Sequence, residues 1–223
     1  MAHTRNILLL GAGGHCLSVL DSLKSLNLYE NIGLVIRDNG DFTASDTDID
    51  KMDSAFIVGS DKDLLLLFEQ GYTDAFITVG SIGNPTIRKS LYNMVKQIGF
   101  NIPNIIDKTA VVSTVVSLGE GIYVGKNAVI NAGCAIGNCT IVNTMALIEH
   151  ECSIGDFAHI APGSILCANV AVGENTHIGA GSMIRQGLDI GTDSIIGMGS
   201  VVLTHIGDHV TAYGSPCKEV KHE

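Results

Sequence analysis

The sequence has no tryptophan, and aromatic residues fill only 5% of its 223 positions. It also has no run of eighteen apolar residues, which argues against a membrane-spanning helix. The apolar run Ile7–Leu10 near the start is too short for a secretory signal and predicts a buried strand instead. The six cysteines form no CxxC pair, so we expect reduced thiols and a cytoplasmic protein.

Basic residues are also scarce. The chain has 13 lysines and arginines against 23 aspartates and glutamates, and its formal net charge is −10. This balance argues against binding to nucleic acid or to an anionic membrane, since both need a basic surface. Glycine, in contrast, is abundant, with 26 residues. A core with few aromatics and many small residues is typical of a repeat architecture.

A six-residue repeat fills the second half of the chain. Every sixth residue from Ile106 to Val202 is aliphatic, in seventeen consecutive hexads without a slip. The residue two places earlier is usually small, as at Ala128 and Ser164, and glycine follows the aliphatic residue in eight hexads. Irregularly spaced strands of a sandwich or barrel would lose this phase, so we predict a triangular solenoid with three hexads per coil. The glycines predict tight corners with positive φ.

The repeat resembles that of the hexapeptide-repeat acyltransferases. This resemblance implies that the solenoid is a left-handed parallel β-helix and that the protein is a homotrimer. The general rule for parallel crossovers would have favoured the opposite hand.

The first hundred residues follow a different pattern, in which short apolar runs alternate with helical stretches. The alternation predicts a small Rossmann-like α/β domain with a parallel sheet, at residues 1–104, followed by the β-helix and a C-terminal tail at residues 105–223. The predicted strands and helices are Asn6–Leu10, Cys16–Leu26, Gly33–Ile36, Ala55–Val58, Asp61–Gln70, Ala75–Val79 and Pro85–Ile98.

A glycine-rich turn, Gly11–His15, follows the first strand and opens the first helix. Backbone N–H groups in such a turn can bind a phosphate. Cys16 stands where the dinucleotide fingerprint needs glycine, so an NAD site is only one alternative beside a turn without ligand and a nucleotide or sugar site.

Histidines are the candidate acid–base residues. His150 points out of the predicted coil between Glu149 and Glu151, which would suit a general base held by a carboxylate, or an ordinary surface histidine. His159 and His177 are one coil apart and should stack on the same side. A metal-dependent lyase of the carbonic anhydrase type is an alternative, although the coils lack the His-x4-His pair of that class; His205 and His209 at their end are separated by three residues.

Three segments make the resemblance specific. Asn143–Gly163, Gly11–His15 and Ala212–Lys218 are similar to motifs of the bacterial sugar acetyltransferases. This group includes sialic acid O-acetyltransferases and N-acetyltransferases of nucleotide-linked 4-amino-sugars. The resemblance implies transfer of acetyl from acetyl-CoA, without a metal, to such an amino group, with sialic acid O-acetylation as the alternative.

The resemblance also implies site residues. His150 would be the general base and Glu151 the carboxylate that orients it. Acetyl-CoA would lie along His159, Ala168, Ala180 and Met198. The sugar or nucleotide-sugar acceptor would contact Gly13, Gly14, His15, Arg37, Asp38 and Gly80.

Overall fold

The computed structural model describes residues 5–37 and 55–220. The chain divides into two compact units, Met1–Gly80 with Thr86–Ile105, and Ser81–Pro85 with Ile106–Glu223. The short segment Ser81–Pro85 therefore packs with the β-helix unit, which the sequence pattern did not indicate. Within the described residues, no helix combines the length and the apolar character needed to cross a membrane.

The first unit is a small α/β fold whose elements match the seven predicted runs within a few residues. They are β1 (Asn6–Leu10), α1 (Gly14–Leu26), β2 (Asn31–Ile36), β3 (Phe56–Ser60), the 3-10 turn η1 (Asp61–Asp63) that leads into α2 (Leu64–Glu69), β4 (Asp74–Ile77) and α3 (Thr86–Ile98).

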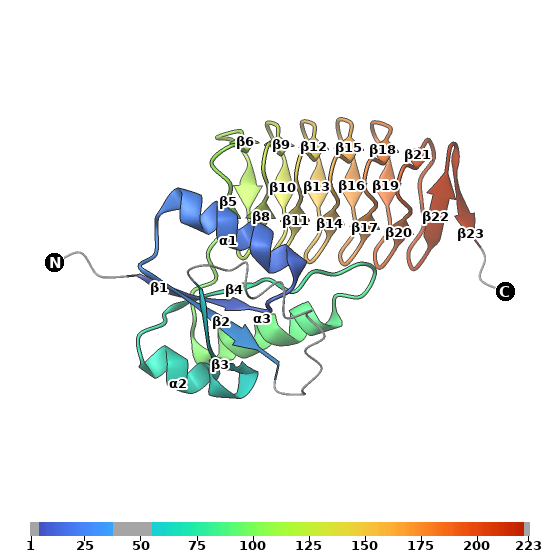
Figure 1. The fold of residues 1–223 in the computed structure, drawn as a ribbon. Helices are drawn as coiled ribbons and strands as arrows, with labels where there is room; N and C mark the ends of the chain where they lie inside the picture. The colour runs from blue at the N-terminus through green and yellow to red at the C-terminus, as the bar shows by residue number, and fades with distance from the viewer. Residues whose placement is uncertain (1–4, 38–54, 221–223) are drawn as a thin grey trace. The chain divides into compact units, whose positions relative to one another are not determined.

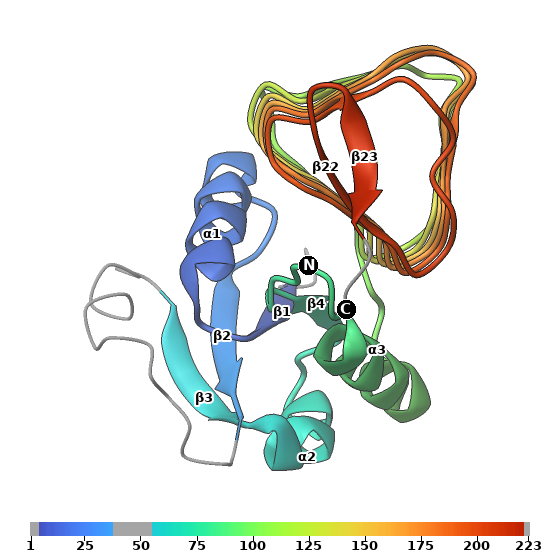
Figure 2. The same ribbon diagram turned by 90° about the vertical axis from the view of Figure 1, so that its right-hand side faces the viewer.

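The four strands form one parallel sheet in the order β3-β2-β1-β4. Helix α1 covers one face, and α2 and α3 cover the other (Figure 2). The central strand β1 is buried on both faces, which explains its unbroken apolar run Ile7–Leu10. The predicted Rossmann-like sheet is confirmed.

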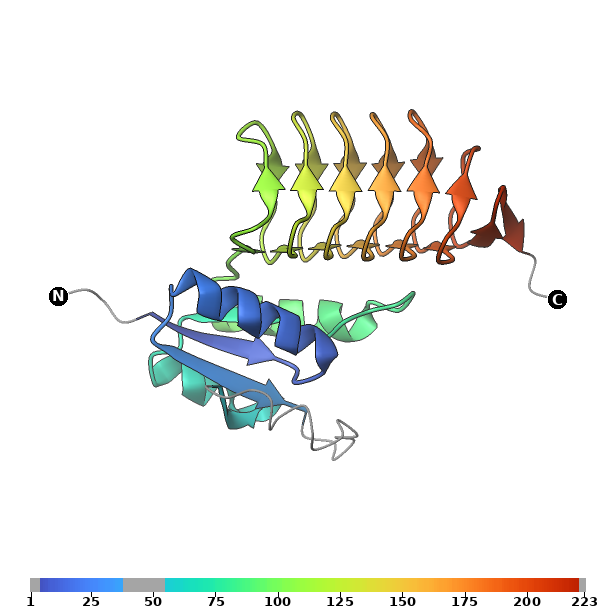
Figure 3. The same cartoon turned by 45° about the horizontal axis from the view of Figure 1, so that its top comes forward.

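The second unit is a parallel β-helix, as predicted (Figures 1 and 3). All seventeen aliphatic residues of the repeat end a two-residue strand. The strands are β5 (Ile105–Ile106), β6 (Val111–Val112), β7 (Ser117–Leu118), β8 (Tyr123–Val124), β9 (Val129–Ile130), β10 (Ala135–Ile136), β11 (Ile141–Val142), β12 (Leu147–Ile148), β13 (Ser153–Ile154), β14 (His159–Ile160), β15 (Ile165–Leu166), β16 (Ala171–Val172), β17 (His177–Ile178), β18 (Met183–Ile184), β19 (Asp189–Ile190), β20 (Ile195–Ile196) and β21 (Val201–Val202).

An antiparallel hairpin, β22 (Thr211–Gly214) and β23 (Cys217–Val220), follows the last coil. The coils are triangular in section (Figure 2). The small inner residues of the hexads are buried as expected, and their hydroxyls bond to the next coil. Ser164 Oγ, for example, donates to Gly179 O at 3.0 Å.

The strands stack into three sheets, and each sheet exposes a different set of side chains. The histidine face is the eight-stranded sheet that contains β14 and β17, and the serine face is the five-stranded sheet that contains β13. The aliphatic face is the six-stranded sheet, and its outward residues are Val111, Val129, Leu147, Ile165, Met183 and Val201.

The prediction about the hexad glycines was wrong. Positive φ falls instead on the residue three places before each aliphatic residue, at every hexad from Gly121 to Gly199. The glycines that follow the aliphatic residues have a different role. A Cβ on Gly155 would lie 2.6 Å from the backbone nitrogen of Glu174 in the next coil. These glycines are therefore required by the close stacking of coils, not by corner conformation.

Candidate active site

In the first unit, the predicted acceptor residues lie at the carboxyl ends of the strands. Gly13 is the N-cap of α1, and Gly14 is its first residue. A Cβ on Gly80 would lie 3.7 Å from the Cβ of His15, so these two residues are neighbours. Exposed Arg37 follows β2 and lines a small cavity at this edge. Asp38 lies outside the described residues.

The turn after β1 requires glycine at Gly11. Its φ is +110°, and a Cβ there would lie 2.7 Å from Cγ2 of Val79. The Gly11 N–H donates to Val35 O at 2.9 Å, and Thr78 Oγ1 donates to Gly11 O at 2.6 Å. These bonds fix the turn at the end of the parallel sheet where α/β folds bind ligands.

In the second unit, His150 stands at the corner that follows the aliphatic face. Its side chain is 56% exposed, and Nδ1 lies 3.3 Å from Oε2 of Glu151, which is 71% exposed. The backbone N–H of His150 donates to Glu149 Oε2 at 3.3 Å. On the next coil, Asn169 N donates to His150 O at 2.9 Å, so Ala168 lies directly beside His150.

Glu151 occupies an unusual backbone conformation for a glutamate, with a φ of +61°. At the same corner, the neighbouring coils carry Gly133, Asn169 and Gly187, residue types that adopt positive φ at little cost. Met145 and Phe157 adopt the same conformation at the other two corners, so the positive φ of Glu151 follows from the geometry of the coil.

A groove of about 370 Å³ lies on the histidine face and reaches the corner that follows it. Its walls are formed by Ile82, His159, Ala161, Pro162, His177, Gly179, Ala180, Ile195, Ile196, Gly197 and Met198. Three of the four residues predicted to contact acetyl-CoA are therefore gathered in it, namely His159, Ala180 and Met198. Ala168 is not, because it belongs to the His150 corner.

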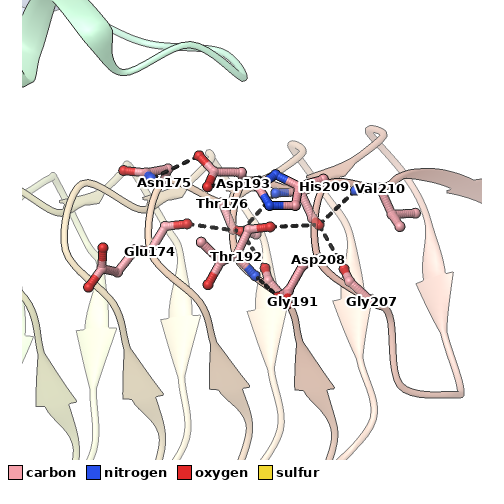
Figure 4. Close-up of polar contacts among 11 residues, drawn as sticks. Glu174, Asn175, Thr176, Gly191, Thr192, Asp193, Gly207, Asp208, His209 and Val210 are labelled. Atoms are coloured by element: carbon pink, nitrogen blue, oxygen red, sulfur yellow. Dashed lines mark hydrogen bonds and ion pairs between the residues drawn. The ribbon is translucent and has the colours of Figure 1, made fainter.

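The third corner, between the serine face and the histidine face, carries a histidine–aspartate pair, in which His209 Nδ1 lies 3.8 Å from Asp193 Oδ2. Its other side chains bond along the coil stack (Figure 4). Asn175 Nδ2 donates to Asp193 Oδ1 at 2.8 Å, and the Thr192 N–H donates to Asp208 Oδ1 at 2.6 Å. This corner therefore stabilises the stacking of the coils.

Cys16, Cys134 and Cys152 are poor nucleophiles because burial raises their pKa values. Cys134 and Cys152 point into the coil as predicted, and burial raises the pKa of the Cys152 thiol to about 11. Burial also raises the pKa of Cys16 to about 11. Thiols with raised pKa values carry little thiolate at neutral pH and react poorly. Among the described residues, no three histidine, cysteine, aspartate or glutamate side chains gather in a way that could hold a metal ion.

Family models match both units. The PglD N-terminal domain model matches residues 6–95, the bacterial transferase hexapeptide model matches residues 151–186, and the model for the hexapeptide repeat of succinyl-transferase matches residues 169–204. Comparison with curated proteins gives no match.

Solved structures match over almost the whole chain. A histidine-to-asparagine mutant of perosamine N-acetyltransferase from Caulobacter crescentus, in complex with CoA and GDP-perosamine, is 33% identical over 97% of both chains, with a TM-score of 0.87. The acetyltransferase domain of PglB from Neisseria gonorrhoeae, in complex with acetyl coenzyme A, is 30% identical over 97% of this chain and 100% of that chain, with a TM-score of 0.84.

The chain belongs to the bacterial hexapeptide-repeat sugar acetyltransferases. It is an acetyl-CoA-dependent acyltransferase, as the sequence motifs implied. WeeI from Acinetobacter baumannii has the same fold, with a TM-score of 0.81 at 22% identity.

Proposed function

We propose that this acetyltransferase moves the acetyl group of acetyl-CoA to the 4-amino group of a nucleotide-linked amino-sugar, with His150 as general base. The single observation that carries the proposal is the pairing of exposed His150 with Glu151, 3.3 Å apart, in a relative of an enzyme solved with CoA and GDP-perosamine. That enzyme has also been solved with one histidine replaced by asparagine or by alanine, which supports a role for a histidine.

The groove on the histidine face suits the pantetheine arm of acetyl-CoA. The arm is a slender and mostly apolar chain with two amide groups. The groove walls are isoleucine, alanine, glycine, proline and methionine, together with two histidines. We assign His159, Ala180 and Met198 to this binding surface.

The His150 corner suits the proton transfer. The acceptor nitrogen attacks the thioester carbonyl, the imidazole of His150 removes its proton, and the thiolate of CoA leaves. The Glu151 carboxylate orients the ring and stabilises the imidazolium that forms. The acetyl group thus passes directly to the acceptor, and no cysteine carries it.

Ala168 suits an oxyanion donor. Its backbone N–H forms no hydrogen bond within the described part of the chain, and it lies on the coil next to His150. A fixed N–H donor aimed at a developing negative charge lowers the barrier of acyl transfer.

The aliphatic face supports the homotrimer. All six outward residues of this face are apolar, and those of the serine face are serine, alanine and aspartate. An unbroken apolar ladder of this kind is typical of a subunit interface. The aliphatic face lies between the groove corner, with Ala180, and the His150 corner. In a closed ring of three, the His150 corner of one subunit would meet the groove corner of the next.

The test is a thiol-release assay with acetyl-CoA and a panel of nucleotide-linked 4-amino-sugars, free amino-sugars and sialic acids. We expect CoA release with the nucleotide-linked 4-amino-sugars and an N-acetyl product by mass spectrometry. An O-acetyl product from a sialic acid, with no turnover of any amino-sugar, would overturn the proposed acceptor. The cytoplasmic location stays a prediction that fractionation of cells would check.

A further inference from the structure

The two histidines of the groove differ in their hydrogen bonds. His159 Nδ1 donates to the backbone oxygen of Ser81 at 2.9 Å, and its Nε2 lies 3.3 Å from Nδ2 of Asn143. Because the Ser81 carbonyl can only accept, Nδ1 carries the proton and Nε2 accepts from the amide of Asn143. Both nitrogens of His159 are thus occupied by the protein.

His177 has no such partners. It is stacked one coil beyond His159, with ring centroids 4.8 Å apart in an edge-to-face arrangement. The residue is only 8% exposed, and its Nδ1 is enclosed without a hydrogen-bond partner. Burial also lowers the pKa of His177, which keeps the ring neutral at physiological pH.

The enclosed nitrogen decides the tautomer. A buried N–H without an acceptor costs more than a buried lone pair without a donor, because donors are rarely left unpaired in folded proteins. The neutral ring therefore carries its proton on Nε2. No other side chain of the groove wall offers a polar hydrogen, since the rest of the wall is aliphatic, glycine, proline and methionine apart from His159.

We propose that His177 is a binding residue for the acyl donor, and that its Nε2–H donates a hydrogen bond to an amide carbonyl of the pantetheine arm in the groove. This inference rests on the proposed function. His159 then serves mainly as a fixed wall of the groove, and His177 supplies the polar contact that an apolar channel otherwise lacks.

The test compares wild type with His177→Phe, which keeps a ring of similar size against His159 but cannot donate. We expect the Kd for CoA and the KM for acetyl-CoA to rise about tenfold, as for one lost hydrogen bond in a dry site, while kcat stays within about twofold. The Kd for adenosine 3′,5′-bisphosphate, which lacks the pantetheine arm, should not change.

His177→Asn and His205→Phe are the accompanying variants. His177→Asn keeps a donor and should recover part of the CoA affinity. His205→Phe makes the same ring substitution at an exposed histidine that does not line the groove, and it should bind CoA as wild type does. Melting curves check that each variant is folded.

Two outcomes would overturn the inference separately from the proposed function. If wild type binds CoA and His177→Phe binds it equally well, His177 is not a binding residue, although the acetyltransferase assignment stands. A loss of kcat with unchanged KM would also overturn it. If wild type itself fails to bind CoA, the proposed function falls and the inference falls with it.

Discussion

The His150 corner and the groove on the histidine face, to which we assign different parts of the proposed reaction, differ in how firmly their histidines are held. In the groove, His159 is held by hydrogen bonds to the Ser81 backbone and the Asn143 side chain, and His177 is almost fully buried. His150 and Glu151 are mostly exposed, and each has the other as its side-chain partner in the ion pair. If the proposed trimer forms, we therefore expect one chain to shape the groove by itself, and the His150 corner to depend on the subunit that lies against it.

The largest effect should come from removing the base. We expect His150→Ala to lower kcat by about 1,000-fold, the usual contribution of a general base, with CoA binding by calorimetry unchanged. His205→Ala is the matched control, because His205 Nδ1 also lies 3.3 Å from an exposed carboxylate, that of Asp189. Near-normal activity in His150→Ala, or equal losses in both variants, would refute the assignment of His150.

A charge on the aliphatic face should have the next largest effect. It would dissociate the proposed trimer and so separate the His150 corner of one subunit from the groove corner of the next. In Ile165→Glu, three like charges would meet in the trimer, at a cost of several kcal/mol. We expect dissociation by light scattering and activity about 100-fold lower at assay concentration. Ser153→Glu, on the serine face of the same coil, should stay trimeric. A fully active Ile165→Glu monomer would show that one chain completes the site.

Glu151→Asn should separate stability from activity at the His150 corner. Asparagine tolerates positive φ better than glutamate, so we expect the free energy of unfolding to rise by about 0.5 kcal/mol. Loss of the carboxylate should lower kcat about tenfold. Thermal melts and steady-state kinetics check both changes, and a variant that is less stable but equally active would contradict the role given to Glu151.

The smallest effect concerns the pH dependence of stability. The pKa of His177 is below its ordinary value in the folded protein, so the unfolded chain binds the proton more readily. Wild type should therefore lose stability relative to His177→Phe as the pH falls below about 6.5, by less than about 1.4 kcal/mol per pH unit. Above neutrality the difference in stability between the two proteins should be constant. Denaturant titrations at pH 5 and pH 8 check this. If the free energies of unfolding of wild type and His177→Phe change equally between the two pH values, the ring is not buried in its neutral form.

The fold was predictable because its determinants are local and repeated. The aliphatic residues and the small inner residues alternate with a fixed period, and the structure places them as predicted. The prediction that the hexad glycines adopt positive φ was wrong, because the sequence shows where a glycine occurs but not which structural constraint requires it. At Gly155 the reason is the backbone of the next coil, which only the stacked structure reveals.

The site was predictable in part. The motif pointed to His150, Glu151 and the histidine pair, and the structure stacks His159 on His177 as their spacing indicates. The separate hydrogen bonding of the two rings could not be predicted. It depends on Ser81, which comes from the segment between β4 and α3, distant in sequence from the coils.

The eighteen-residue coil also restricts how this protein can change in length. An insertion or deletion of a whole coil would leave each downstream residue on its own face, and would only lengthen or shorten the stack. Removal of six residues would keep the aliphatic residues inside but rotate every later side chain to the neighbouring face, so that the groove and the apolar ladder would no longer continue. A length change that is not a multiple of six residues would turn the core outward. We therefore expect the β-helices of related proteins to differ in length by whole coils.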